Sequence, residues 1–531
     1  MLCSRNANIP IALVLTLAIA AIVSAAPAAA KQEIVYNLSA KPMTLDPAYA
    51  FDRPSLTLAL NMFEGLVRLD AAGRPEPAMA QSWKISNDGL IYRFTLRQAF
   101  WSNGLPVTAA DFVYAWLRAL APKQPAERTP MLYVLANAEA YSKGAIADPN
   151  QVGVTAIDPR TLEVRLARPT GHFLAMCTMP PFLPVCRKAV EAYPDDWSWN
   201  PKAAIANGPF HLVKYEKDDI VLAPNPYYWE KDLCRLQSVE FTWLAQDKIE
   251  SALASGAIDG AADPPRGLAA PQSFQSDLRL TYLEFNKKKP PFDQLLMRSV
   301  VAAALDRTGF AERLQGSEVP AYALVPPGLG DAAPGKDFRS QGTSLLTGTD
   351  LNLAKQLLSV AGHQNGAGLP PLELIYVSGG RNQIFAETVA ANLAAIGMKI
   401  VPVALSWLDY QTRLQKGEFS LARMGWIADY PDPYSFLSLF ASDASTNYGG
   451  YHSDSYDAML REAAMTAEPA ARMEIMHQAE AFVLSDLPVV PVSFGRIYFA
   501  EGPLLRNVTH SIAGVPIFAR AWVAALPAAM T

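Results

Sequence analysis

The chain has 531 residues, of which half are apolar and 18% are charged, and its formal net charge is −5. A chain of this length exceeds a single ordinary hydrophobic core, so we expect two or three lobes. The small negative net charge supplies no basic surface of the kind that binds nucleic acid, which argues against a nucleic-acid partner.

The first 30 residues have the pattern of a secretory leader. Arg5 precedes an apolar run from Ile9 to Val23, and the small residues Ala28 to Ala30 precede Lys31. This pattern predicts export to the periplasm with cleavage near Ala30. A membrane anchor fits less well because the uninterrupted apolar run is short for a bilayer span. Cys3 lies before the apolar run, which excludes a lipoprotein cysteine.

Three cysteines remain after the leader, namely Cys177, Cys186 and Cys234. Their number is odd, so at least one thiol is free or pairs outside the chain. Cys177 and Cys186 flank a proline-rich bend and could form a disulfide in an oxidising compartment, or both could be buried free thiols. The spacings match no zinc site, and we expect neither a metal nor a cofactor.

The first half of the chain shows strand signals with one hairpin. Residues 82–86 and 90–96 alternate as strands around Asn87-Asp88-Gly89, which is a strong turn signal. Thr108 and Asp111 then resemble the capping box of a helix that ends at Pro122. Further predicted strands are 33–38, 161–166 and 239–244.

The second half shows an α/β pattern. A strand over 372–377, a helix over 382–396 and a strand over 399–404 predict a β-α-β unit with a parallel strand pair. A strand over 278–285 precedes a single long helix from Asp293 to about Leu314. Helices over 455–465 and 469–485 lead to a strand over 488–494.

The stretch Leu421–Phe436 contains the most informative charged residues. The spacing predicts a strand over 421–427 and a loop over 428–433. Asp429 therefore stands at the mouth of a strand, where a carboxylate is costly to bury unless a cation meets it. Alternatively, Asp429 only caps the turn, since Asp and Pro are ordinary turn residues.

No catalytic signature is present in the sequence. The motifs of serine hydrolases and zinc proteases are absent, and no two of the six histidines are four residues apart. A secreted protein of this size without such motifs favours binding over catalysis. A secreted hydrolase and a holdase-like chaperone are alternative hypotheses from other classes.

Taken together, segments from about Ile34 to about Trp522 resemble the oligopeptide-binding family of ABC importer receptors, extracellular solute-binding protein family 5. The segments that carry the resemblance are FEGLVRLD, AQSWKISNDGLIYRFTLRQAFWSNGLPVTAADFVYAW, AIDPRTLEVRLARP, NGPF, NPYYW, FNKKKPPFDQLLMRSVVAAALDR, ARMGWIADYPDPYSFL and LPVVPVSF. The resemblance implies an α/β, two-lobed periplasmic-binding-protein (Venus-flytrap) fold of type II, cluster C, with an extra third domain. Periplasmic binding proteins close around ligands by hinge motion.

Carried onto this chain, the family's domains have the following expected boundaries. Lobe I would comprise residues 31–63, 191–280 and 496–531, the extra domain 64–190, and lobe II 281–495. Two crossing strands would join the lobes.

The resemblance also implies ligand-binding residues. Asp429, in the W-x-x-D part of the motif with Trp426, matches the residue that receives a peptide's α-ammonium group. Arg423 matches an arginine that meets the C-terminal carboxylate of short peptides, and Glu284 and Trp407 match positions that line the cleft. The peptide backbone would be held by strand-like hydrogen bonds.

The sequence departs from the family pattern at the carboxylate end of the site. Asn382 replaces a histidine that helps select peptide length, with Arg381 beside it. Leu414 replaces an arginine, with Arg413 adjacent, and Met131 replaces a cleft tyrosine, with Tyr133 nearby. The amine anchor is kept, so we expect a short peptide as ligand, with murein-derived peptides, oligosaccharides or a metal chelate as alternatives. The expected partners are the subunits of an ABC permease, and we expect a monomer.

Overall fold

A computed structural model describes residues 31–525 except 71–72, 123–127, 217–218, 334 and 343–344. The predicted leader and Cys3 lie outside the described residues. Cys177, Cys186 and Cys234 are free thiols, and the first two are buried. Within the described ranges, no helix is long and apolar enough to cross a membrane.

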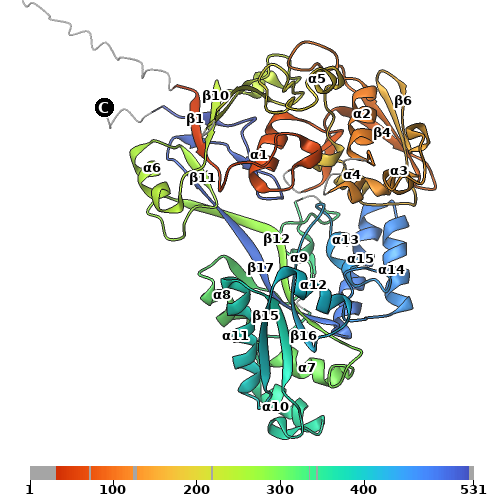
Figure 1. Ribbon diagram of the computed structural model, residues 1–531, viewed down its shortest axis with the longest axis vertical. Coiled ribbons are helices and arrows are strands. Elements are labelled where there is room, and N and C mark those ends of the chain that lie inside the picture. The colour runs from red at the N-terminus through yellow and green to blue at the C-terminus, as the bar shows by residue number, and fades with distance from the viewer. Residues whose placement is uncertain are drawn as a thin grey trace, which may run out of the picture.

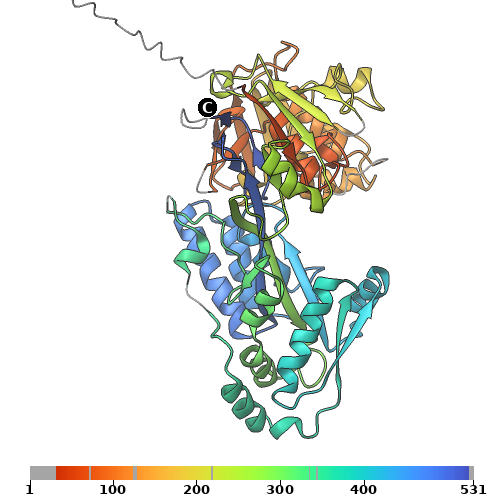
Figure 2. The same cartoon turned by 90° about the vertical axis from the view of Figure 1, so that its left-hand side faces the viewer.

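Two long antiparallel strands run through both halves of the molecule, as Figures 1 and 2 show. They are β12 (Gln272–Phe285) and β17 (Val489–Glu501), and they form the centre of one eleven-stranded sheet. The sequence predicted only one part of each strand, 278–285 of β12 and 488–494 of β17. The missed parts connect the two lobes.

The sheet divides on either side of these two strands. The upper lobe in Figure 1 contains β1 (Glu33–Asn37), β8 (Phe210–Tyr215), β9 (Ile220–Pro224), β10 (Ser238–Thr242) and β11 (Gly260–Ala262). The lower lobe contains β13 (Glu318–Pro320), β14 (Leu372–Val377), β15 (Ile400–Leu405) and β16 (Leu421–Ile427). The two-lobed α/β fold is therefore confirmed.

A β-bulge bends β12 between the lobes. Ser276 pairs with Arg496 and Leu280 with Phe494, so three residues of β12 lie opposite Gly495 alone. Leu278 within the bulge has φ of 51°, a left-handed conformation that is strained for a residue with a side chain. A Cβ atom on Gly495 would lie 2.1 Å from Asp277 Oδ1, so any other residue there would displace the buried Asp277 side chain.

The lower lobe contains the expected β-α-β unit. Strands β14 and β15 pair in parallel and are connected by α11 (Gly380–Ala394). The single long helix expected from Asp293 to Leu314 was wrong, because two helices occupy this stretch, α7 (Leu295–Ala304) and α8 (Arg307–Arg313). The break occurs at Asp306, whose carboxylate accepts a hydrogen bond from the Gly309 N–H and begins a new helix.

A separate four-stranded antiparallel sheet forms the third part of the fold, at the upper right in Figure 1. Its strands are β4 (Ala80–Ile85), β5 (Ile91–Leu96), β7 (Thr161–Arg165) and β6 (Val154–Asp158). The predicted hairpin is confirmed as β4–β5. The capping box of Thr108 and Asp111 is confirmed at the start of α2 (Ala109–Ala119).

The remaining helices cover the sheets or connect them. They are α1 (Arg53–Met62), α3 (Ala138–Ser142), α4 (Phe173–Met176), α5 (Arg187–Ala192), α6 (Ile249–Ser255), α9 (Phe338–Gln341), α10 (Leu351–Val360), α12 (Trp407–Gln415), α13 (Tyr434–Leu437), α14 (Asp454–Met465) and α15 (Pro469–Ser485). Short strand pairs complete the fold, namely β2 (Val67–Leu69) with β3 (Pro75–Pro77), β18 (Leu505–Arg506) with β21 (Trp522–Val523), and β19 (Thr509–His510) with β20 (Pro516–Ile517).

The hydrophobic core has separate centres on the two sides of the hinge strands. The largest cluster joins the upper lobe to the four-stranded sheet and includes Tyr36, Phe94 and Trp116. Two further clusters fill the lower lobe, one beneath α7 and α11 and one around α13 to α15. Because each side has its own packed core, the lobes can move as bodies about β12 and β17.

Candidate ligand-binding site

Strand β16 has one edge that is only partly used. On one side it pairs with β12 over its whole length, from Leu421 to Ile427. On the other side it pairs with β14 only at Leu421 and Ala422. Among the residues that the structure describes, no strand pairs with the remainder of this side. We call residues Arg423–Ile427 on this side the free edge.

The direction of the backbone groups along the free edge follows from the ladder with β12. Ser420 O accepts from Asn286 N–H, and Ala428 N–H donates to Leu278 O, so the even-numbered residues bond to β12. The N–H and C=O groups of Gly425 and Ile427 therefore point away from β12. Both residues are exposed. An extended chain can add to the sheet here through main-chain hydrogen bonds.

Asp429 lies just beyond the end of the free edge and is half-buried. Its backbone N–H donates to Ser435 Oγ at 3.1 Å, and the same oxygen lies 3.4 Å from Trp426 Nε1. Burial raises the pKa of the Asp429 carboxyl, and the nearby guanidinium of Arg128 lowers it. Because Asp429 is half-buried, its carboxylate does not lie at the open surface. Within the described residues it has no ion pair, so no cation neutralises it directly.

The loop that carries Asp429 is held by two other elements. The ring of His172 stacks on Tyr430 and on Tyr434 with centroid separations of 4.6 Å and 4.8 Å. Asp432 accepts two hydrogen bonds of 2.8 Å from the guanidinium of Arg472. These contacts fix the loop from both sides, which positions the Asp429 carboxylate before any ligand arrives.

Arg423 lies at the other end of the free edge, with most of its side chain inside the protein. Its carbonyl accepts a hydrogen bond from the Tyr410 hydroxyl at 2.6 Å, but its buried Nε has no hydrogen-bond partner in the structure. Burial lowers the pKa of Arg423, Tyr410 and Glu318 raise it, and the neighbouring Arg279 and Arg381 lower it. An arginine side chain stays protonated in proteins, so this end of the edge carries positive charge.

Glu284 is only 3% exposed and lies on the opposite face of the sheet from Arg423, since it pairs with Ala422 in the register. Its Oε1 accepts from Gly449 N–H at 2.6 Å, and its buried Oε2 has no partner in the structure. Burial raises the pKa of Glu284 to about 8. At neutral pH it is an uncharged acid and does not cancel the charge of Arg423.

The structure brings some of the other predicted residues to this region. The Asn382 side chain donates to Val377 O at 2.8 Å, at the carboxyl end of β14 that meets the free edge. The indole of Trp407 is 65% exposed, with a ring centroid 6.3 Å from that of Tyr410. Its exposure fits a surface that awaits a ligand.

Two predicted residues lie apart from the free edge. Arg413 pairs with Glu373 and donates to Glu418 O. Glu373 is at the beginning of β14, the end opposite to Asn382. The hydroxyl of Tyr133 lies 3.5 Å from Ser142 Oγ, within the third part of the fold.

The sequence interpretation noted Arg381 beside Asn382 but missed the other charged neighbours of the site. Arg128 acts on Asp429 from a short helical turn, and Arg279, Arg381 and Glu318 surround Arg423. One available signal was the run Ser378-Gly379-Gly380-Arg381, which follows a predicted strand and opens a predicted helix. Such turns commonly bind anions.

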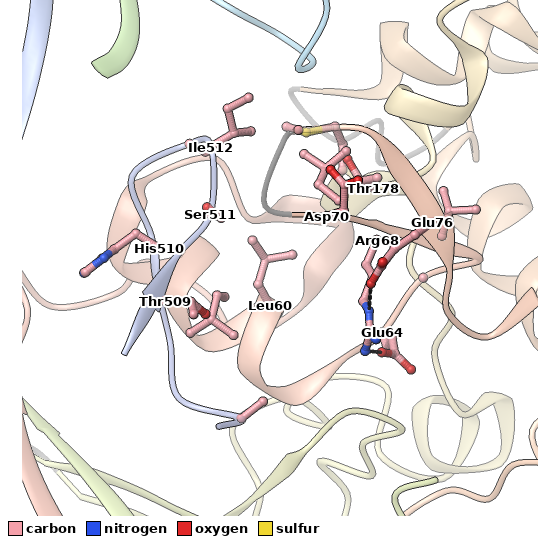
Figure 3. A pocket seen from close by; sticks show the side chains of 18 of the residues that line it. Leu60, Glu64, Arg68, Asp70, Glu76, Thr178, Thr509, His510, Ser511 and Ile512 are labelled. Atoms are coloured by element: carbon pink, nitrogen blue, oxygen red, sulfur yellow. Dashed lines mark hydrogen bonds and ion pairs between the residues drawn. The ribbon is translucent and has the colours of Figure 1, made fainter. Parts of the chain in front are cut away.

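A cavity of about 900 Å³ lies elsewhere, where both lobes and the third part of the fold meet (Figure 3). Its walls come from α1, from 508–513 and from the loop around Gly330, and no predicted site residue lines it. Its Arg68 pairs with Glu76 at 2.7 Å and with Glu230 at 2.6 Å. These side chains already pair with one another within the protein, so we assign the cavity to the joint between the parts. No group of three metal-binding side chains occurs in the described part of the chain.

Comparisons with known proteins agree with this geometry. The chain is 32% identical to the dipeptide-binding protein DppE of Bacillus subtilis over 91% of this chain and 90% of that protein. It is 31% identical to a probable deoxycholate-binding periplasmic protein, YgiS, of Escherichia coli, over 92% of each chain. The unliganded open form of the Escherichia coli murein tripeptide-binding protein MppA superposes with a TM-score of 0.82, at 29% identity, over 93% of this chain and 98% of that one.

The lobes are thus arranged as in an open, ligand-free receptor. The family model of bacterial extracellular solute-binding proteins, family 5, matches residues 74–448, which is more than half of the chain. The chain therefore belongs to family 5 of the bacterial extracellular solute-binding proteins.

Proposed function

We propose that this protein is a periplasmic receptor that captures short peptides by hinge closure and delivers them to an ABC import permease. The observation that carries the proposal is the free edge of β16 with opposite charges at its ends. An unneutralised carboxylate, Asp429, stands beyond one end and the cationic Arg423 at the other. A peptide zwitterion has the complementary charges.

The direction of the bound peptide follows from these charges. The ammonium group would meet Asp429, which follows the carboxyl end of β16, so the peptide would run antiparallel to β16. Trp426, Trp407 and Asn382 would contact it, whereas Glu284 would act from the opposite face of the sheet. The outward-pointing groups of Gly425 and Ile427 pair with about three residues, roughly 10 Å of extended chain.

We assign no direct ligand contact to Arg413 or Tyr133, because both pair elsewhere in the ligand-free protein. Main-chain pairing does not depend on side-chain identity. The proposed receptor would therefore accept many sequences.

The proposed closing motion is a rotation of the lobes about β12 and β17. We divide the chain into lobe I (31–63, 191–280 and 496–531), an extra domain (64–190) and lobe II (281–495). Separate cores on the two sides of the hinge support the boundary between lobe II and the other two parts. Export with cleavage near Ala30, a monomeric state and the absence of catalysis complete the proposal.

Calorimetry with di- to pentapeptides and their N-acetylated counterparts tests the proposal. We expect free peptides to bind and acetylated ones to bind much more weakly, because acetylation removes the ammonium charge. Equal binding of both sets would remove Asp429 from its role. Absence of binding across the whole panel would overturn the function.

A second candidate is a receptor for murein-derived peptides. The similarity to the open form of a murein tripeptide-binding protein favours it over the oligosaccharide and metal-chelate alternatives. Native mass spectrometry of ligand that co-purifies with the protein separates these candidates by mass.

A further inference from the structure

A chain of ion pairs passes through the hinge and ends beside Arg423. Arg53 at the start of α1 lies 3.4 Å from Asp277 in the bulge of β12, and Asp277 lies 3.2 Å from Arg279. Arg279 lies 3.0 Å from Glu318 on β13, and Glu318 also pairs with Arg381 on α11. The chain therefore connects α1 of the upper lobe to α11 of the lower lobe.

The chain of ion pairs carries an excess of positive charge. Together with Arg423 it contains four guanidinium groups, while Asp277 and Glu318 supply two carboxylates. Both acids are 2% exposed, so solvent counter-ions do not reach them. In the described part of the chain, Arg423 has no ion pair. Two positive charges thus lack a counter-charge in the ligand-free protein.

The turn between β14 and α11 adds backbone donors to the same place. Gly379 precedes the first residue of α11, and no side chain caps this fifteen-residue helix. Residues 378–380 are exposed, and a Cβ atom on Gly380 would meet nothing within 4 Å, so there is open space beside the start of the helix. A helix amino terminus favours negative charge. We call Ser378–Asn382 with Arg423 the anion niche.

The direction of a bound peptide points its carboxyl end at the anion niche. Strand β14 is parallel to β16 and stops pairing with it at Ile375 and Ala422. A peptide added antiparallel on the free edge lies in line with β14 and runs toward it. Its last residue therefore meets the turn that follows β14.

We propose that the anion niche selects peptides whose carboxyl-terminal residue carries a second negative charge, with Arg381 as the specificity-determining residue. This inference rests on the proposed function. One carboxylate would neutralise Arg423, and the second would pair with Arg381. The Arg381 side chain is 39% exposed, so it can turn toward the ligand. Glu318 would keep Arg279 and the hydroxyl of Ser493, which donates to it at 2.7 Å.

Calorimetry with matched peptide pairs tests this selectivity. For each length from two to five residues, one peptide ends in Glu, one in Gln and one in phosphoserine. We expect the purified protein to bind the Glu peptides at least about tenfold more tightly than the Gln peptides, which corresponds to about 1.4 kcal/mol. The phosphoserine peptides distinguish a preference for phosphate from one for carboxylate.

Variants assign the selectivity to Arg381. In R381Q the ratio of the two affinities should fall to about one, while R381K should retain part of it. R413Q is the matched control, because Arg413 belongs to the same lobe but pairs with Glu373, and its ratio should equal that of the parent protein.

Two outcomes overturn different statements. If Glu and Gln peptides bind the parent protein equally well, or if R381Q keeps the ratio, the inference is wrong and the proposed function stands. If no peptide of the panel binds, the proposed function is overturned, and the inference with it.

Discussion

The two ends of the free edge are built differently. At the Asp429 end, a single carboxylate is held by a loop that His172 and Arg472 clamp, and one cation, Arg128, acts on it without an ion pair. At the Arg423 end, several guanidinium groups share two buried acids, and a helix amino terminus adjoins them. The Asp429 end would bind its ligand through one carboxylate, whereas the positive charge at the Arg423 end is spread over several guanidinium groups.

This difference suggests how a receptor can be strict at one end of its ligand and adjustable at the other. Every peptide with a free amino terminus presents the same ammonium group, so one fixed partner suffices. The carboxyl end varies in position with peptide length and in charge with the last residue. A set of guanidinium groups, some of them partly exposed, can follow that variation without a change in the fold.

The largest expected effect comes from D429N, which removes the carboxylate that has no ion pair among the described residues at the amine end. Losing one partner of a desolvated ion pair costs about 2–5 kcal/mol, so we expect peptide affinity to fall at least about thirtyfold. Calorimetry with one peptide and its acetylated form provides the control. The acetylated peptide should bind the parent protein and D429N equally, and an equal loss for both peptides would contradict the assignment.

A smaller loss is expected for R423M, because the neighbouring guanidinium groups remain. Hydrogen bonds to charged groups contribute about 1.5–3 kcal/mol, so affinity should fall roughly ten- to hundredfold for a free peptide. A peptide with an amidated carboxyl terminus should lose little. The ligand-free variant should be as stable as the parent protein or more so, because a buried cation near Arg279 and Arg381 is removed. A large drop in Tm would indicate a structural role instead.

The buried Glu284 lies on the opposite face of the sheet from Arg423, and its protonation at neutral pH can be tested. Its pKa is raised by burial to about 8 from about 4.5, so folding takes up a proton between these values. The stability that this group contributes is complete below pH 4.5 and is lost as pH rises through 8, by up to about 1.4 kcal/mol per pH unit. E284Q imitates the protonated acid and should escape this loss. Its Tm relative to the parent protein should rise by a few degrees between pH 5 and pH 8, and a constant difference would show that Glu284 is already ionised.

The sequence was sufficient to predict the helices, strands and turns that have strong periodicity or strong turn signals. The strand over 421–427, the loop that carries Asp429, the β-α-β unit and the hairpin at Asn87-Asp88-Gly89 occur where the patterns place them. Each depends on apolar residues at the spacing of one type of element, or on a turn that demands particular residues. In natural sequences such local preferences agree with the overall fold, so the predicted elements form where the patterns indicate.

The hinge and the charge network could not be predicted in the same way. The first residues of β12, Gln272 to Asp277, are polar except for Phe274 and show no apolar alternation, because the hinge buries neither face fully. Arg53, Asp277, Glu318 and Arg381 are far apart in the sequence, and only pairing of β12 with β17 and of β13 with β17 brings them together. A site that depends on such long-range pairing leaves no local pattern.

The smallest expected effect concerns Arg128, the cation near Asp429. Its charge lowers the pKa of the Asp429 carboxyl, which burial otherwise raises. In R128M that pKa should therefore increase, and peptide binding, which needs the ionised carboxylate, should begin to weaken at a higher pH on the acid side. At neutral pH the carboxylate remains ionised and has lost a competing cation, so affinity should be unchanged or slightly higher. Calorimetry from pH 4 to pH 8 on both proteins measures the shift. If R128M instead lost affinity at neutral pH, Arg128 would contact the peptide itself, and the amine end would share the distributed character of the carboxyl end.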